Sequence, residues 1–427
     1  MAPAAWAQLA QQLEAEQLKH SAAQDAGKAV GAKVRRATLA FQFGEFDGAT
    51  SAALEAVSAL KAVPAEIYCP DPHRNYALSG AIEAAASLSA TLDFVRTGTF
   101  PSKPDYCDDT EYVSGLLGAS SELSRYATRR ATAGDVESVA ACRDGVACLH
   151  EAMLEFDLRN GPLRRKFDGL KYSLRRLEDL LYEQSLVGRS VTESTAAAAA
   201  SRQEGALASL KVIKVSLDEH DAARERVIKQ SRDVQKGAKQ AIFALHRGDS
   251  EKAHALLAES TGFARAVLQD ADLLVKWPDL RNGSFAAALE EWAEAALFAH
   301  WLENDGEVAS PDQLPLQLTP DEYLGGIADL TGEIGRLAVA AATRRDGAAV
   351  LRVYATDLAV LEQLTTLPLP PKLNKKLDPL TTAVRKIETI LYELSLAAAS
   401  ATAPKRPSST IDDDAETKKP RNDDEDD

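Results

Sequence analysis

The sequence predicts an all-α fold built from two tandem helical domains. Apolar residues recur at intervals of three and four, as in "LRRLEDLLYEQSL" and "VRKIETILYELSL", which is the spacing of one face of an α-helix. Alternating runs bounded by Asn-Gly or Asp-Gly turns, which would indicate strands, are scarce. The 427 residues, 45% of them hydrophobic, are enough for two or three domains with full cores.

Two long segments of the chain occur twice. "EYVSGLLGASSELSR" (111–125) returns as "EYLGGIADLTGEIGR" (322–336), and "LRRKFDGLKYSLRRLEDLLYEQSL" (163–186) returns as "LNKKLDPLTTAVRKIETILYELSL" (373–396). Both matches lie about 210 residues apart, which is too long for the unit of a solenoid. They predict two complete copies of one domain.

Composition predicts where these domains begin and end. Residues 191–210 are rich in Ala, Ser, Thr and Gly, so we expect a linker between domains at 1–190 and 211–400. Beyond residue 400 the chain becomes polar and charged. Such a segment cannot bury enough apolar surface to fold, so residues 401–427 are expected to be a disordered tail.

Charge and cysteine use exclude several classes of protein. The net charge of −15 argues against a uniformly basic nucleic-acid-binding surface, and no apolar run is long enough to span a membrane. The N-terminus lacks a secretory signal, and four cysteines without a CxxC pair fit a reducing compartment. Lys405–Arg406 and Lys418–Lys419 have the spacing of a two-part nuclear import signal, so we expect cytoplasmic and nuclear localisation.

The repeated motifs resemble the translin family, and the two halves resemble different members of it. In the first half, "YVSGLLGASSELSRYATRRATAGD" and "LRRKFDGLKYSLRRLEDLLYEQSLVG" are similar to translin. In the second half, "LDEHDAARERVIKQSRDVQKGAKQAIFALHR", "EEWAEAALFAHWL" and "LTPDEYLGGIADLTGEIGRL" are similar to translin-associated factor X (TRAX). The resemblance covers roughly residues 5–190 and 211–398. This chain departs from the family by joining both types of subunit covalently.

The resemblance implies both an assembly and an activity. Family members are helical bundles that form closed shells, so we expect a homo-oligomer, octamer-like in form. The translin–TRAX complex is a Mg²⁺-dependent endoribonuclease that prefers single-stranded RNA and acts in small-RNA and tRNA processing, with its catalytic carboxylates on TRAX. For this chain the resemblance implies Mg²⁺, with Mn²⁺ as a substitute, and single-stranded RNA or DNA as the partner.

The spacing of carboxylates in the second half is compatible with a metal site. Glu291 and Glu294 are one helical turn apart, and so are Asp329 and Glu333. If these two faces meet, their oxygens form the kind of site that holds Mg²⁺ or Mn²⁺. The resemblance assigns catalysis to Glu291, Glu294 and Asp329, which with Glu333 are the predicted metal ligands. The alternative is an ordinary solvated face.

The internal repeat refines this prediction. Gly118 aligns with Asp329, whereas Glu122 aligns with Glu333 and is therefore present in the half that lacks the other acids. This pattern leaves a structural role for Glu333 open. Glu290 precedes the TRAX-like pair and is expected to face solvent.

Two histidines lie where TRAX-like sequences also carry histidine. His246 and His300 are expected to be packed and hydrogen-bonded, with a role near the substrate as the alternative. No Ser/His/Asp arrangement, glycine-rich phosphate loop or zinc spacing supports another chemistry.

The segment 158–176 of the first half is strongly basic and carries aromatic residues. Cationic side chains there can neutralise phosphates, and aromatic rings can stack on bases; the alternative is a solvated face opposite a core stripe. The predicted nucleic-acid-binding residues are Arg164, Arg165, Lys166, Lys171, Arg175 and Arg176. A division of labour follows, in which the first half binds RNA and the second half cuts it.

Two other functions remain open on the sequence alone. One is a non-catalytic assembly protein that binds single-stranded RNA or DNA, in which the carboxylates serve folding. The other is a helical scaffold for protein partners that uses its charged tail for interaction.

Overall fold

The computed structural model describes residues 3–64, 78–189 and 207–402, and these ranges contain helices and no strand. The predicted all-α fold class is therefore confirmed. Most of the predicted linker and tail, including both basic pairs of the tail, lies outside the described residues.

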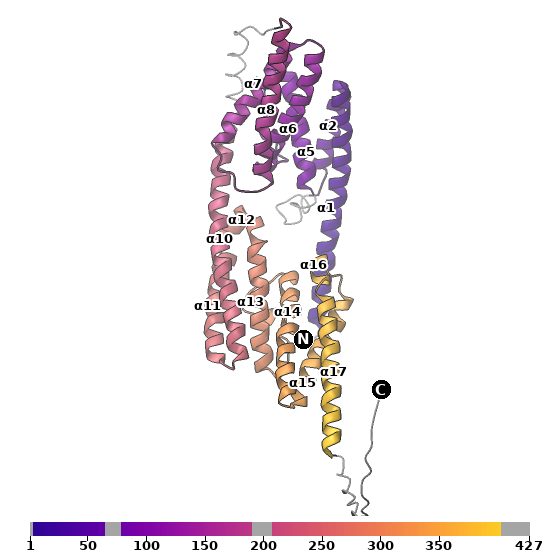
Figure 1. Ribbon diagram of the computed structural model, residues 1–427, viewed down its shortest axis with the longest axis vertical. Helices are drawn as coiled ribbons and strands as arrows, with labels where there is room; N and C mark the ends of the chain where they lie inside the picture. Colours follow the sequence, from indigo (N-terminus) through magenta and orange to yellow (C-terminus); the bar gives the residue numbers. More distant parts are fainter. Residues whose placement is uncertain (1–2, 65–77, 190–206, 403–427) are drawn as a thin grey trace, which may run out of the picture.

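The helices form two bundles that lie end to end along the long axis of the molecule (Figure 1). The first is built mainly from α1 (Pro3–Phe43), α2 (Phe46–Lys61), α5 (Ser79–Thr97), α6 (Asp109–Thr132), α7 (Val136–Leu154) and α8 (Pro162–Leu186). The second is built mainly from α10 (Ser209–His246), α11 (Ser250–Leu268), α12 (Ala271–Lys276), α13 (Ser284–Glu303), α14 (Pro320–Thr343), α15 (Gly347–Thr366), α16 (Pro371–Asn374) and α17 (Leu377–Thr402). Two short 3₁₀ helices, η1 (Pro278–Arg281) and η2 (Pro311–Gln313), flank α13.

Helix α1 begins in the second bundle and ends in the first. Leu9 and Leu13 are buried in the hydrophobic core formed by α10 to α17, and Trp6 packs against that core. From Ala23 to Phe41 the buried residues of α1 belong instead to the core of the first bundle. Figure 1 accordingly shows the chain starting beside α14 and α15 and running toward α2.

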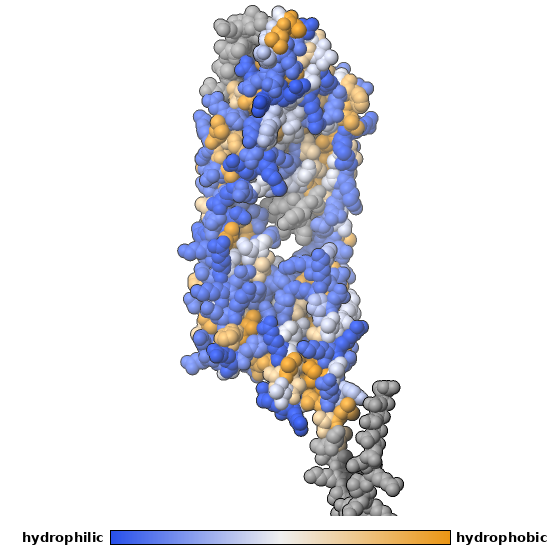
Figure 2. Space-filling view, viewed as in Figure 1, coloured by the Kyte–Doolittle hydropathy of each residue, from blue (hydrophilic) through white to orange (hydrophobic). Residues whose placement is uncertain are grey.

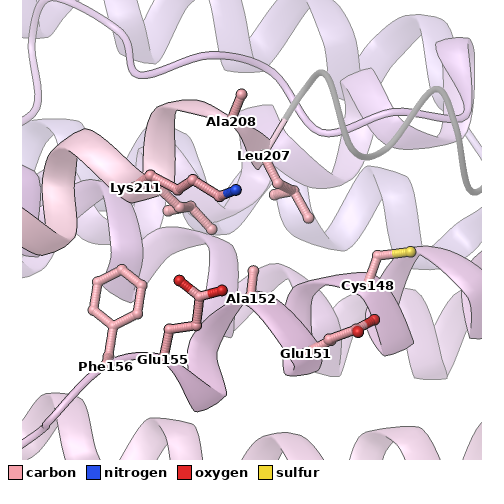
Figure 3. A pocket seen from close by; sticks show the side chains of 9 residues that line it. Cys148, Glu151, Ala152, Glu155, Phe156, Leu207, Ala208 and Lys211 are labelled. Carbon is pink, nitrogen blue, oxygen red and sulfur yellow. The ribbon is translucent and has the colours of Figure 1, made fainter.

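Helix α10 makes the reciprocal crossing. Leu207, just before α10, and Leu210 and Ile213, at its start, are buried in the core of the first bundle, and the later buried residues of α10 belong to the second. In Figure 3, Leu207 and Ala208 line a pocket of about 230 Å³ together with Ala152 near the end of α7. The two bundles therefore exchange the first turns of their first helices, and a cut between the halves removes part of both cores.

The two copies start their central helices with the same device. Before α6, the Asp108 side chain accepts a hydrogen bond from the backbone of Glu111, and the Glu111 carboxylate accepts one from the backbone of Asp108. Thr319 and Glu322 repeat this reciprocal pair before α14. Each pair satisfies two N–H groups that a helix start would otherwise leave without a partner.

The surface agrees with the absence of membrane-spanning runs in the sequence. No helix within the described ranges is both long and apolar enough to cross a membrane. Figure 2 shows hydrophilic residues over most of the visible face of both bundles. Cys107 and Cys142 are buried and Cys148 is half-buried, whereas Cys69 lies outside the described residues.

Candidate functional site

The predicted carboxylates of the second bundle lie where α13 and α14 pack closely. A Cβ atom on Gly326 of α14 would lie 2.6 Å from the Ala293 Cβ and 2.9 Å from the backbone nitrogen of Glu294. Because glycine has no side chain, the two helices approach at this point almost backbone to backbone. Asp329 lies on the next turn of α14.

Glu294 is the most perturbed carboxyl group of this site. Its side chain is buried, with 8% of the residue exposed, and it makes no hydrogen bond or ion pair within the described residues. Its pKa is raised to about 8, mainly by burial and in addition by the negative charges of Asp329, Glu333 and Glu291. The other three carboxylates predicted as ligands therefore lie close enough to Glu294 for their charges to act on it.

Two of these acids are already paired with lysines. The Glu291 carboxylate lies 3.3 Å from the ammonium group of Lys239 on α10, and both side chains are partly or largely exposed. The Asp329 carboxylate accepts a hydrogen bond of 2.5 Å from Lys376, which lies between α16 and α17. Each acid would have to change its partner before it could bind a metal.

Glu290 does not face solvent, so that prediction is wrong. It is 8% exposed, and its two carboxylate oxygens accept hydrogen bonds of 2.5 Å from Lys372 and 2.7 Å from Lys376. Burial by itself raises the pKa of Glu290, but the hydrogen bonds from the two lysines outweigh burial and lower it. Gly325 makes room for this cluster, since a Cβ there would lie 2.7 Å from the Glu290 carboxyl carbon.

Glu333 has structural partners, as the repeat suggested. Its carboxylate lies 2.6 Å from the His246 ring and 2.9 Å from Arg336. In the first bundle Glu122 lies in the same way between Gln42 of α1, at 3.3 Å, and Arg125, at 2.9 Å. This shared arrangement connects the first helix of each copy to its central helix.

The two histidines differ from each other. The His246 ring is hydrogen-bonded to Glu333 and packs against Phe298 with 4.9 Å between ring centroids, which agrees with the packed role predicted for it. His300 is half-buried, and its Nε2 atom has no hydrogen-bond partner within the described residues. The expected hydrogen bond of the His300 ring is therefore not found.

The four carboxylates have the chemistry of a divalent-cation site, but their side chains are not arranged around a common point. Buried and half-buried carboxylate oxygens are the ligands that Mg²⁺ and Mn²⁺ prefer, and a cation would offset the desolvation that raises the pKa of Glu294. Within the residues that the structure describes, no three His, Cys, Asp or Glu side chains are already grouped to hold a metal ion. Three of the four acids point instead to cationic partners.

The first bundle carries the same frame without these acids. Gly115 approaches Ala86 and Ser87 as Gly326 approaches Ala293 and Glu294, which aligns α5 with α13 residue by residue. In this alignment Ala84, Ser87 and Gly118 occupy the positions of Glu291, Glu294 and Asp329. Near Ala84, a pocket of about 380 Å³ between α1 and α5 is lined by Arg35, the counterpart of Lys239.

The Glu–Lys pair is the part of the site that both bundles share. Glu83 aligns with Glu290, and its carboxylate lies 2.5 Å from Lys166, the counterpart of Lys376. Lys166 also donates a hydrogen bond to the Ser114 hydroxyl. The sequence repeat already matched Lys166 with Lys376, but the carboxylates that they bind are far away in the chain, so the pairing could not be seen.

Only part of the basic segment on α8 is available to a ligand. Lys166 is bound to Glu83, and Arg164 and Arg176 form ion pairs with Asp168 and Glu183. The remaining predicted residues are exposed and have no acidic partner within the described residues: Arg165, Lys171 and Arg175.

Comparison with known families identifies both halves with one family. The model described as "Translin family" matches residues 75–188 and 222–397, which together are more than half of the chain. Chicken translin (Gallus gallus) is 34% identical over 83 residues, which are 19% of this chain and 36% of that protein. Human translin is 34% identical over 93 residues, or 22% of this chain and 40% of that protein.

The match to the second type of member is longer. Mouse translin-associated protein X (Mus musculus) is 27% identical over 241 residues, covering 46% of this chain and 83% of that protein. The chain thus spans less than half the length of the translins it matches. The solved "Structure of AfC3PO - duplex RNA complex" aligns with a TM-score of 0.40 and 22% identity, covering 44% of this chain and 98% of that one.

Proposed function

We propose that this chain, which belongs to the translin family, is a metal-dependent endoribonuclease that acts on single-stranded RNA. The observation that supports the proposal most is the close packing of α13 against α14 at Glu294, which places Glu291, Glu294 and Asp329 on adjoining turns of the two helices in the second bundle only. The first bundle has the same frame, with Ala84, Ser87 and Gly118 in their places, so the acids are not required by the fold.

Glu291, Glu294 and Asp329 would hold the divalent cation. When bound, such a cation supplies a polarised water molecule and stabilises the charge that develops on the phosphate. The packing of α13 against α14 fixes the backbone of Glu294 and keeps its carboxyl group away from bulk water. Glu333, held by His246 and Arg336, adds a fixed negative charge next to these ligands.

The exposed cations of the first bundle would bind the RNA backbone. Arg165, Lys171 and Arg175 on α8 have no acidic partner within the described residues, and Lys171 lies 5.1 Å from the centre of the exposed Tyr172 ring. Cations that neutralise phosphates and a ring that can stack on a base are the features of a single-strand-binding surface.

A second function is favoured by the contacts of the acids themselves. Asp329 is paired with Lys376, and Glu333 with His246 and Arg336, so the cluster is partly satisfied without a metal. On this alternative the chain is a non-catalytic protein that binds single-stranded RNA or DNA and assembles into oligomers.

Cleavage of a labelled single-stranded RNA separates the two functions. The full chain is assayed with Mg²⁺ and with EDTA, beside Glu294→Gln and a first-bundle control variant, Glu122→Gln, at the counterpart of Glu333. We expect cleavage with Mg²⁺ only, a loss of at least about 100-fold in Glu294→Gln, and little change in Glu122→Gln. RNA binding without cleavage would favour the alternative, and cleavage that persists in EDTA would contradict the proposed dependence on a metal.

The binding surface is tested by the dependence of RNA affinity on salt. Replacing Arg165, Lys171 and Arg175 by alanine is expected to reduce the slope of log K against log salt by about 2, since each contact with single-stranded RNA contributes about 0.7. An unchanged slope would exclude this surface.

A further inference from the structure

We propose that Lys376 is a positioning residue that takes the place of a divalent cation among the carboxylates while no metal is bound. Its ammonium group holds Asp329, and Asp329 has to exchange this partner for the metal. The proposal rests on the proposed metal-dependent function and adds to it a role for a lysine that the repeat matched with Lys166 but to which it gave no function.

The ammonium group of Lys376 has a complete set of acceptors. Its Nζ atom lies 2.5 Å from an Asp329 oxygen, 2.7 Å from a Glu290 oxygen and 3.3 Å from the Gly325 carbonyl oxygen. An ammonium group has three protons, and each has an acceptor here. The side chain is 23% exposed, so the cation lies largely within the protein.

Of the two carboxylates that Lys376 binds, Asp329 is the one that can be released. Glu290 is buried, and Lys372 occupies its second oxygen, so it keeps a cation on both sides. The Asp329 side chain is 37% exposed, and Lys376 is its one partner among the described residues. Its charge also acts on Glu294, so it lies within the field of the proposed ligands.

The first bundle shows that the contact with Asp329 is not part of the shared frame. Lys166 binds Glu83 and Ser114 from the same position, and Gly118 stands where Asp329 would be. In both copies the lysine therefore binds a glutamate of the facing helix: Lys166 binds Glu83 of α5, and Lys376 binds Glu290 of α13. Its second acidic contact occurs only in the bundle that carries the other acids.

A positive charge at this place must weaken the binding of a divalent cation. Lys376 competes for Asp329 and repels a second cation, whereas uncharged Gln removes both effects and can still donate a hydrogen bond. The Lys376→Gln variant is therefore expected to bind Mn²⁺ at least about tenfold more tightly than the unaltered protein. Lys166→Gln, which removes the matching lysine from the bundle without the acids, is expected to leave Mn²⁺ affinity unchanged.

Titration of the full chain with Mn²⁺, with the free ion measured by electron paramagnetic resonance, tests both proposals separately. If the unaltered protein shows no Mn²⁺ site that Glu294→Gln abolishes, the proposed function fails and this inference fails with it. If that site exists but Lys376→Gln binds Mn²⁺ no more tightly, the function stands and the role of Lys376 is overturned.

Chemical labelling of lysines in the unaltered protein keeps the test independent of the folding of the variant. An amine-reactive reagent and mass spectrometry measure the labelling of Lys376 and Lys166 with and without Mn²⁺. Loss of the Asp329 contact on metal binding predicts faster labelling of Lys376 and no change at Lys166. Equal labelling of Lys376 with and without Mn²⁺ would overturn the proposal. Because this experiment uses the unaltered protein, its result stands even if the Lys376→Gln variant does not fold.

Discussion

Asp357 offers a stability prediction whose size follows from the structure. This residue of α15 is 0% exposed, and neither of its carboxylate oxygens has a hydrogen-bond partner within the described residues. Burial raises its pKa from an ordinary 3.8 to about 8. In the first bundle the matching position of α7 is Val146, which is also 0% exposed. Replacing Asp357 by Val should therefore stabilise the second bundle.

The gain depends on pH in a defined direction. A carboxyl group whose pKa is raised by folding destabilises the folded state progressively as pH rises from its unfolded to its folded value. For Asp357 this window runs from 3.8 to about 8, and each pKa unit is worth about 1.4 kcal/mol. The destabilisation is thus about 4 kcal/mol at pH 7, of which about 3 kcal/mol develops above pH 5. Asp357→Val should remove it.

Tryptophan fluorescence measures this bundle selectively. All four tryptophans, at positions 6, 277, 292 and 301, lie in or against the core of the second bundle. Urea unfolding followed by their emission should show an advantage of Asp357→Val that grows between pH 5 and pH 8 and then levels off. Asp357→Asn, which cannot ionise, should show the same change with pH. An advantage that is equal at pH 5 and pH 8, or a destabilised variant, would refute the reasoning.

Three further perturbations test the fold and the site. Leu13→Ala should lower the stability of the tryptophan-containing bundle by roughly 2 to 5 kcal/mol, although Leu13 lies in the first half of the sequence; a transition unchanged by the mutation would contradict the exchange of first helices. Gly326→Ala should cost roughly 1 to 3 kcal/mol in the same transition, because its Cβ would lie 2.6 Å from that of Ala293; wild-type stability would show that α13 and α14 can move apart. Glu294→Gln should raise the stability of the metal-free protein by about 3 kcal/mol at pH 7, since folding raises the pKa of Glu294 from 4.5 to about 8. Thermal unfolding measured between pH 4.5 and pH 8 should show this gain disappear near pH 4.5.

The sequence was sufficient for the fold class and for the identity of the two copies, because both depend on local patterns. Helical spacing of apolar residues is visible within a short window, and the repeat compares one part of the chain with another. The exchange of α1 and α10 could not be predicted in this way. Periodicity shows that Leu9, Leu13 and Leu210 are on a buried face, but it does not show which core buries them.

The candidate site was predictable only in part for the same reason. The acids of α13 and α14 were predicted as ligands, and the counterpart Glu122 left a structural role for Glu333 open, for which the structure supplies the partners His246 and Arg336. Glu290 was misjudged because its partners, Lys372 and Lys376, lie 82 and 86 residues further along the chain. Without those lysines an acid at this position would have to face water, and a buried carboxylate is stable only where a cation is brought to it.

The comparison of the two bundles separates what the fold needs from what it tolerates. Both keep a buried or half-buried Glu bound to a lysine from a distant part of the same bundle, and both keep a Glu bound to an arginine one turn further along the same helix. The second bundle adds Glu294, whose pKa of about 8 marks a carboxyl group that the folded chain would be more stable without. Protein sites that lower stability are commonly those that bind or react, because selection for stability alone would replace them, as Ser87 does at the matching position of the first bundle. The cost of Glu294 therefore supports the proposed cation because three other carboxylates act on this group, whereas burial alone accounts for the similar cost of Asp357.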